Sequence, residues 1–184
     1  MKIDLRVVKT KVALQEALLM LLKEKTLNSI SVTEICQMAQ VNRGTFYAHY
    51  GQIENLFEEY FKEIMKDLIN SYQEPYKHKR IIITSELNPA TIRIFHHIEK
   101  YKKFYRIVFS KNAPMSYYYL LFDQIDDLLK KDMERNGGKD VDIAMLSAYQ
   151  ANAILGIVIE WYKQDFQQSA DYLNQQLVLI LNIK

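Results

Sequence analysis

The chain has 184 residues, 49% of them apolar, and a formal net charge of +2. This length allows one or two domains with a real hydrophobic core, and the single cysteine, Cys36, excludes an internal disulfide and any metal site built from several cysteines. The net charge is too small to identify a nucleic-acid binder, since residues 1–71 hold nine Lys and Arg against nine Asp and Glu.

Only 5 Gly and 3 Pro interrupt the sequence, which predicts an almost entirely helical protein. The opening is charged from its second residue, and the longest purely apolar runs, such as Ile157–Ile159, are far too short to cross a bilayer. We therefore expect a cytoplasmic protein that does not enter the membrane. Cys36 falls inside a predicted helix beside Ile35, so a buried structural thiol is favoured over a redox sensor.

Two helices are expected in the first forty residues. The first should run from about Leu5 to Lys25, because apolar residues recur there at helical spacing. The second should begin at Val32, because Ser31 and Glu34 form a capping box. Its inward-facing residues are expected to be Ile35, Met38 and Ala39.

A third helix should follow almost at once. The apolar spacing breaks at Gln40–Asn42, and Asn42 is a good N-cap for a helix that runs to Tyr50. Two short helices joined by about three residues are typical of a helix-turn-helix unit. The second helix of such a unit enters the DNA major groove and brings its first residues to the base edges.

The first residues of this third helix suit contact with DNA. Arg43 has the fork that fits the acceptors of guanine, and Gly44 lets the backbone come close. Thr45 can meet a phosphate or a thymine methyl, while Tyr47 and His49 could donate to phosphates.

The string VNRGTFYAHY, followed by the acidic helix start Glu54–Leu56, resembles the DNA-binding domain of TetR-family transcriptional regulators. The resemblance implies a three-helix DNA-binding head, an all-helical regulatory body, a homodimer on a DNA operator and usually a small-molecule inducer. It puts Phe46 and Tyr50 inward. The residues expected to contact DNA, the bases for some and phosphates for others, are Ser31, Thr33, Asn42, Arg43, Gly44, Thr45, Tyr47 and His49.

Two positions differ from the family pattern. Gln40 stands where the turn commonly has Gly, so a left-handed backbone there would be strained by about 1 kcal/mol. Ile53 stands where a Lys usually touches a phosphate, and the loss of that contact should lower the salt slope of DNA binding by about one unit.

The head is expected to span residues 1–51 and the ligand-binding and dimerisation body residues 52–184, with about nine helices in total. A long helix from near Gln52 should join the two, and by analogy a ligand that shifts this helix would change the separation of the two recognition helices. The segment from Gln73 to Glu86 is predicted to be a connection, and its basic run is more often a solvated loop than a second nucleic-acid contact.

The body is predicted to contain four further helical regions. Asn88 and Pro89 should start a fifth helix, followed by the segment Lys100–Ser110, which is similar to the corresponding stretch in one large branch of the family. The later elements are a helix from Pro114, a polar loop over Lys130–Lys139, a long helix over Val141–Phe166 and a last helix capped by Ser169.

Candidate sites in the body are less well defined. His96 and His97 cannot form a metal site together, because adjacent side chains on a helix point about 100° apart, and a satisfied, partly buried His96 is favoured. The abundance of Tyr and Met suggests an inducer pocket, although such a stripe is more often core. The predicted pocket residues are Phe95, Tyr105, Met115, Tyr118 and Tyr149, and the predicted dimer-interface residues are Leu155, Ile159, Tyr162, Leu173 and Leu177.

The sequence favours a homodimeric DNA-binding regulator, most simply a repressor that binds a pseudo-palindromic operator and is released by a small molecule. No catalytic residue, cofactor or metal is expected, because phosphate-cradling loops, nucleophile elbows and metal-ligand spacings are absent from the sequence. The alternative is a protein of the same fold that acts as a coactivator through protein contacts without reading DNA. Ile53 and the neutral head favour the coactivator, whereas Arg43 and the intact GTFYAHY string favour DNA binding.

Overall fold

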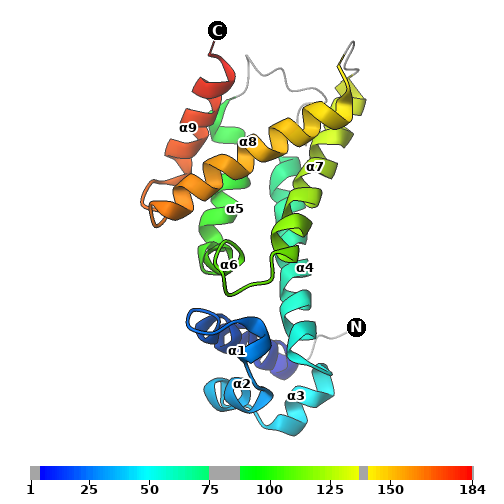
Figure 1. Cartoon of the computed structure of the whole chain (residues 1–184), viewed down its shortest axis with the longest axis vertical. Coiled ribbons are helices and arrows are strands. Elements are labelled where there is room, and N and C mark those ends of the chain that lie inside the picture. Colours follow the sequence, from blue (N-terminus) through cyan, green and yellow to red (C-terminus); the bar gives the residue numbers. More distant parts are fainter. Residues whose placement is uncertain (1–4, 75–87, 137–140, 184) are drawn as a thin grey trace.

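The computed structural model describes residues 5–74, 88–136 and 141–183. Within these ranges every regular element is a helix, nine of them α-helices, which confirms the predicted all-α class. Figure 1 shows a small group of helices at one end of the molecule and a larger helical body at the other, with one long helix running between them. The basic run that precedes residue 88 lies outside the described residues.

The end with the small group of helices forms the head. It comprises α1 (Leu5–Leu21), a single 3₁₀ turn η1 (Leu27–Ser29), α2 (Val32–Ala39) and α3 (Arg43–His49), and it leads into α4 (Ile53–Gln73). α1 ends before the predicted Lys25, because the Lys23 and Glu24 amides bond to carbonyls three residues back and tighten the last turn. Buried residues of α4 belong to the same hydrophobic cluster as those of α1 to α3, and the division after residue 51 stays a prediction.

Local capping explains where α2 and α3 begin. The Ser31 hydroxyl accepts a hydrogen bond from the Glu34 amide at 3.2 Å, and the Glu34 carboxylate accepts one from the Ser31 amide at 2.9 Å. The Asn42 side chain accepts a hydrogen bond from the Gly44 amide at 2.9 Å. Both predicted caps are therefore confirmed, and each satisfies amides that an isolated helix would leave free.

The prediction that Met38 on α2 faces inward is wrong. Met38 is 46% exposed, whereas Cys36 is buried with Ile35. The buried face of this short helix runs along Ile35, Cys36 and Ala39, which leaves Met38 at its edge. Phe46 and Tyr50 on and after α3 are 0% and 4% exposed, so their predicted inward packing is confirmed.

The body contains η4 (Pro89–Thr91), α5 (Ile94–Lys100), α6 (Lys102–Val108), α7 (Ser116–Asn136), α8 (Ile143–Lys163) and α9 (Ala170–Leu181). Asn88 does act as a cap, but of the 3₁₀ turn, because its side chain accepts from the Ala90 amide and α5 begins only at Ile94. Ser169 caps α9 as predicted, accepting from the Tyr172 amide at 3.2 Å.

Both ends of α7 and both ends of α8 also differ from the prediction. α7 begins at Ser116 rather than Pro114 and continues through the predicted loop to Asn136. Tertiary contacts hold this extension, since Tyr72 on α4 donates a hydrogen bond to Asp132 at 2.6 Å. α8 begins at Ile143 and ends at Lys163, because Asp165 and Phe166 adopt left-handed backbones with φ of 55°. The buried Phe166 ring then packs at 5.1 Å from Trp161.

Aromatic side chains form the centre of the core where α4, α6 and α7 meet. The Phe57 ring lies 4.5 Å from Tyr117 and 6.0 Å from Phe104, and Phe61 lies 5.8 Å from Phe104. Such pairs stabilise the packing beyond the area that they bury. This cluster fixes α4 against the body.

A second connection joins head and body through Asn112, in the loop between α6 and α7. Its side-chain amide donates to the carbonyl of Leu22 at 2.9 Å and to that of Lys23 at 3.3 Å, just after α1 ends. The Leu27 amide donates in return to the Asn112 carbonyl at 3.1 Å. These bonds satisfy carbonyls that the end of a helix leaves without partners.

Among the described helices, α8 is long and apolar enough to cross a membrane, judged by length and composition only. Only 22% of its apolar window is buried inside the single chain. Much of the apolar surface of α8 is therefore exposed in the single chain.

Candidate nucleic-acid interface

The predicted DNA-contacting residues gather on the outer part of α2 and α3, at the free end of the head in Figure 1. All are exposed to solvent except His49, which is half-buried, and Tyr47 is 51% exposed. The buried Phe46 and Tyr50 on the opposite side of α3 anchor the helix to the head. The arrangement leaves the N-terminal end of α3 open to a partner.

Two of these residues already have structural roles. The Ser31 hydroxyl donates a hydrogen bond to Glu34 at 2.8 Å within the capping box, and Asn42 caps α3. Both side chains therefore hold the helices in place, and their predicted contacts with DNA remain predictions.

The charge on this face is favourable for a polyanion. Arg43 is exposed at the start of α3, and the sequence from Ile35 to Ile53 contains no Asp or Glu. Glu34 is engaged by Lys25 and Ser31, which lower the pKa of its carboxyl to about 2. The acid within α2 is therefore paired with a cation.

Gly44 has no structural requirement within the chain. A Cβ built on it would meet only the Asn42 side-chain oxygen at 3.6 Å, which is ordinary van der Waals contact. Glycine destabilises a helix by about 0.5–1 kcal/mol relative to alanine. The absence of a packing reason among the described residues is consistent with a backbone that approaches a partner closely.

A hydrogen-bonded group locks α3 to α1 and α4. Lys11 lies 2.6 Å from one oxygen of Glu59, and the Tyr50 hydroxyl donates to the other. Burial alone would raise the pKa of Glu59, but the hydrogen bonds from Lys11 and Tyr50 lower it below the usual value. The orientation of the recognition helix thus depends on side chains from three helices.

The two departures from the family pattern have clear structural effects. Gln40 adopts the left-handed conformation, with φ 54° and ψ 39°, that the turn requires. Ile53 is 7% exposed and packs in the core, so it does not face a phosphate. Cys36 is buried, and burial raises the pKa of its thiol, which favours the unreactive protonated form.

The five residues predicted to line an inducer pocket do not surround one space. Phe95 and Tyr105 are 0% and 1% exposed within the packed interior. Met115 and Tyr149 are 66% and 72% exposed on the surface, and Tyr118 lies at the edge of the core. The structure instead contains a polar cleft of about 320 Å³ between α4 and α5.

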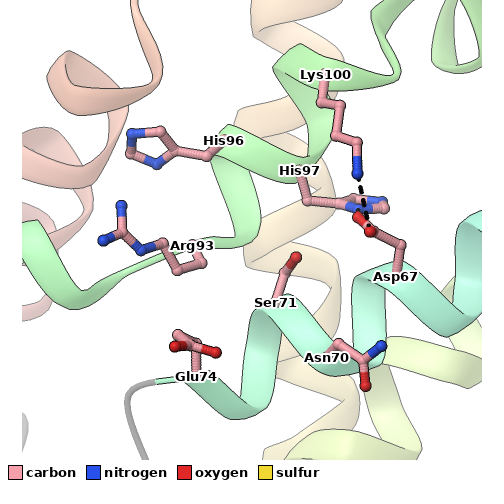
Figure 2. A pocket seen from close by; sticks show the side chains of 8 residues that line it. All are labelled: Asp67, Asn70, Ser71, Glu74, Arg93, His96, His97 and Lys100. Carbon is pink, nitrogen blue, oxygen red and sulfur yellow. Dashed lines mark hydrogen bonds and ion pairs between the residues drawn. The ribbon is translucent and has the colours of Figure 1, made fainter.

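A buried chain of hydrogen bonds forms one wall of this cleft (Figure 2). His97 Nδ1 lies 2.7 Å from an oxygen of Asp67, and Nε2 lies 2.8 Å from the Tyr105 hydroxyl. Because a carboxylate only accepts, Nδ1 donates to Asp67 and Nε2 accepts from Tyr105. Burial lowers the pKa of His97 below its usual value despite the nearby Asp67, so a neutral ring links α4, α5 and α6.

His96 is partly buried, as predicted, although its Nδ1 has no partner among the described residues, and its neighbour His97 is the fully buried histidine. His97 is 2% exposed, whereas His96 is half-buried, with Nε2 3.1 Å from Asp171 on α9. The spacing of Ile94 and Ile98, which flank His97 on the inner face of α5, is the signal that could have placed it inward. Among the described residues, no group of His, Cys, Asp and Glu side chains is arranged to hold a metal ion.

The predicted interface residues are divided between core and surface. Leu155 and Leu173 are 1% and 6% exposed within the chain, so a partner cannot reach them without rearrangement. Ile159, Tyr162 and Leu177 are partly buried. The large apolar side chains of α8 and α9 that are exposed are Met145, Tyr149, Tyr172, Leu179, Ile180 and Leu181.

An exposed recognition helix in a helix-turn-helix head, attached by a long helix to an all-helical body, defines a DNA-binding transcriptional regulator. Residues 14–60 match the family model of bacterial regulatory proteins of the tetR family, and residues 85–183 match that of a transcriptional regulator C-terminal region of the same family. The chain belongs to the TetR family of transcriptional regulators.

Known relatives are distant in sequence. An uncharacterized HTH-type transcriptional regulator of Bacillus subtilis, YxbF, is 20% identical over 163 residues, which cover 89% of this chain but only 42% of the relative. The dhaKLM operon transcriptional activator DhaS of Lactococcus lactis is 24% identical over 146 residues, 76% of this chain and 72% of the relative.

Solved structures share the fold. A dihydroxyacetone kinase operon activator DhaS superposes with a TM-score of 0.64 at 23% identity, covering 94% of this chain and 93% of that one. The fatty acid degradation regulator FadR of Bacillus halodurans has a TM-score of 0.69 at 15% identity, covering 98% and 96%. A FadR from Bacillus subtilis, solved with stearoyl-CoA, has a TM-score of 0.67 at 18% identity, covering 92% and 96%.

Proposed function

We propose that the protein binds a pseudo-palindromic operator as a homodimer, represses transcription there, and is released by a small-molecule inducer. The exposed N-terminal end of α3, free of carboxylates and led by Arg43 and Gly44, is the observation that carries the DNA-binding part. A dimer placed on a promoter blocks polymerase by occupancy alone, which makes repression the simplest outcome. No catalytic role is proposed.

The first experiment is binding of the purified protein to its own upstream DNA against a scrambled duplex, at two salt concentrations. Selective binding that weakens with salt is expected, because phosphate contacts release counterions. Arg43→Ala should cost about 1–3 kcal/mol of binding free energy and relax selection at one base position.

Gly44→Ala separates a DNA role from a folding role. Because an added Cβ has room within the chain, the variant should unfold at the same temperature as the natural protein or higher. Its DNA affinity should nevertheless fall, since the Cβ would lie between α3 and the groove. Lys131→Ala on α7 is the control, because this exposed side chain lies in the body, outside both the head and the proposed dimer face, so the DNA affinity should not change.

The proposed dimer uses the exposed stripe of α8 and α9. Met145, Tyr149, Ala153 and Gly156 recur every three or four residues on one face of α8 and are all exposed. Small residues in such a stripe let a second helix approach closely. A two-fold arrangement of α8 and α9 would bury this face, and it would put the two heads at the opposite end, ready for successive major grooves.

Gly156→Leu tests this interface. The new side chain has open space in the single chain, so it should not destabilise the fold, but it would occupy the space of a partner helix. We expect sedimentation equilibrium to show a weaker dimer for Gly156→Leu and an unchanged one for Gly156→Ala. Equal dimerisation of both variants would show that the dimer interface lies elsewhere.

We also propose a cytoplasmic location. An interface between two copies of the chain would cover the apolar face of α8, so a membrane is not needed to explain the composition of this helix. A detergent-independent dimer in solution would support this explanation.

Activation is the alternative, because the relative DhaS is named as a transcriptional activator. A coactivator of the same fold would act through contacts with other proteins, without reading DNA. A folded dimer that shows no selective DNA binding at low salt, and no change on Arg43→Ala, would favour that coactivator.

A further inference from the structure

The cleft between α4 and α5 is lined entirely by polar and charged side chains. Its volume of about 320 Å³ lies at the small end of ligand sites. α4 contributes Asp67, Asn70, Ser71 and Glu74, and α5 with the residue before it contributes Arg93, His96, His97 and Lys100. A lining without apolar side chains suits a hydrophilic ligand and not an acyl chain.

Several lining groups are already paired with each other. Lys100 donates to one oxygen of Asp67 at 2.9 Å, and His97 donates to the other at 2.7 Å. The negative charge of Asp67 is therefore balanced within the wall of the cleft. His97 uses its second nitrogen to accept from Tyr105, so neither group is available to a ligand.

Other lining groups are not satisfied by any described residue. The Arg93 guanidinium, the Asn70 amide and the Ser71 hydroxyl make no hydrogen bond or ion pair within the described part of the chain. His96 Nδ1 is buried without a partner there. In Figure 2, Arg93 and His96 extend from α5 to the same side of the cleft, and Ser71 points toward α5 from α4.

We propose that this cleft binds a small, hydroxylated anion, such as a hydroxy acid or the phosphate ester of a small polyol. The Arg93 fork matches a carboxylate or phosphate in two parallel hydrogen bonds, and Ser71 and Asn70 supply further donors. His96 Nε2 lies 3.1 Å from Asp171, which leaves Nδ1 as the ring nitrogen that can bond to a ligand hydroxyl.

The test is a titration of the full chain with inorganic phosphate, at constant pH and ionic strength, that follows the imidazole NMR signals of His96 and His97. A saturable shift of the His96 signals is expected. Arg93→Gln should weaken phosphate binding by about tenfold or more, the usual loss for a charge-assisted hydrogen bond. Lys103→Gln, which removes an exposed cation of α6 outside the cleft, should leave it unchanged.

A parallel titration with acetate distinguishes a carboxylate from a phosphate site. Ser71→Ala, which keeps all charges, should weaken binding a few-fold and covers the case in which Arg93→Gln does not fold. Equal binding by Arg93→Gln and the natural protein, or the same shift with chloride, would overturn the proposal. The regulatory meaning of the site rests on the proposed function, but this titration contains no DNA, so the two ideas fail separately.

Discussion

Tyr105→Phe is the sharpest test of the hydrogen-bonded chain that links α4, α5 and α6. The change removes one hydroxyl and keeps the ring, so the aromatic packing around a residue that is 1% exposed is preserved. It also leaves His97 Nε2 without its donor, on a side chain with 0% exposure. A buried acceptor that loses its partner costs about 1–3 kcal/mol of unfolding free energy.

For a chain of this length each kcal/mol lowers the melting temperature by about 2–4 °C. We would measure thermal and urea unfolding at neutral pH and at one fixed protein concentration, because dimerisation makes the melting temperature concentration-dependent. Tyr118→Phe is the matched control, since its hydroxyl has no hydrogen bond to the described residues, and it should change stability by less than about 0.5 kcal/mol. A loss no larger in Tyr105→Phe than in Tyr118→Phe would refute the role of the chain.

Three further outcomes are expected. Gln40→Gly should raise the free energy of unfolding by up to about 1 kcal/mol in urea denaturation, because it relieves the left-handed backbone at φ 54°. Cys36 should react with a soluble thiol reagent far more slowly in the native protein than in urea, because it is 4% exposed with a raised pKa, and rapid native labelling would contradict its burial. The free energy of unfolding should fall on acidification from pH 7.5 to 5, because the pKa of His97 in the folded protein lies below its unfolded value near 6.5. The contribution of His97 to the free energy of unfolding is complete above the unfolded pKa and is lost as the pH falls through the folded pKa. His97→Gln should flatten this pH dependence, and Asp67, whose pKa is also lowered, extends the loss in the same direction at still lower pH.

The head could be predicted from sequence because its determinants are local. The Ser31–Glu34 capping box and the Asn42 cap each lie within a few residues of the helix that they start, so the sequence carries the whole signal. The need for a left-handed residue at Gln40 followed from the family pattern of the same turn.

The body was harder because distant contacts set its boundaries. α7 continues to Asn136 partly because Asp132 receives a hydrogen bond from Tyr72, sixty residues away along the chain. α5 begins at Ile94 although Asn88 and Pro89 look like a helix start, because the same cap serves a 3₁₀ turn equally well.

The sites of the body could not be predicted, because they depend on which apolar helix faces pack against each other. α8 is apolar on nearly all sides, so periodicity could not tell the buried Leu155 from the exposed Met145 and Tyr149. The polar cleft escaped prediction because its groups come from two helices that only the fold brings together.

The bond between Asn112 and the end of α1 bears on how such proteins can be recombined. Consider a chimera that takes its head from one regulator and its body from another and is joined inside the long helix α4. In such a chimera Asn112 would come from one parent, and the Leu22 and Lys23 carbonyls with which it pairs would come from the other. The same holds for the Leu27 amide, which donates to the Asn112 carbonyl. Grafts that bring the loop of residues 109–113 from the same parent as the head should therefore retain operator recognition better than grafts joined at α4 alone.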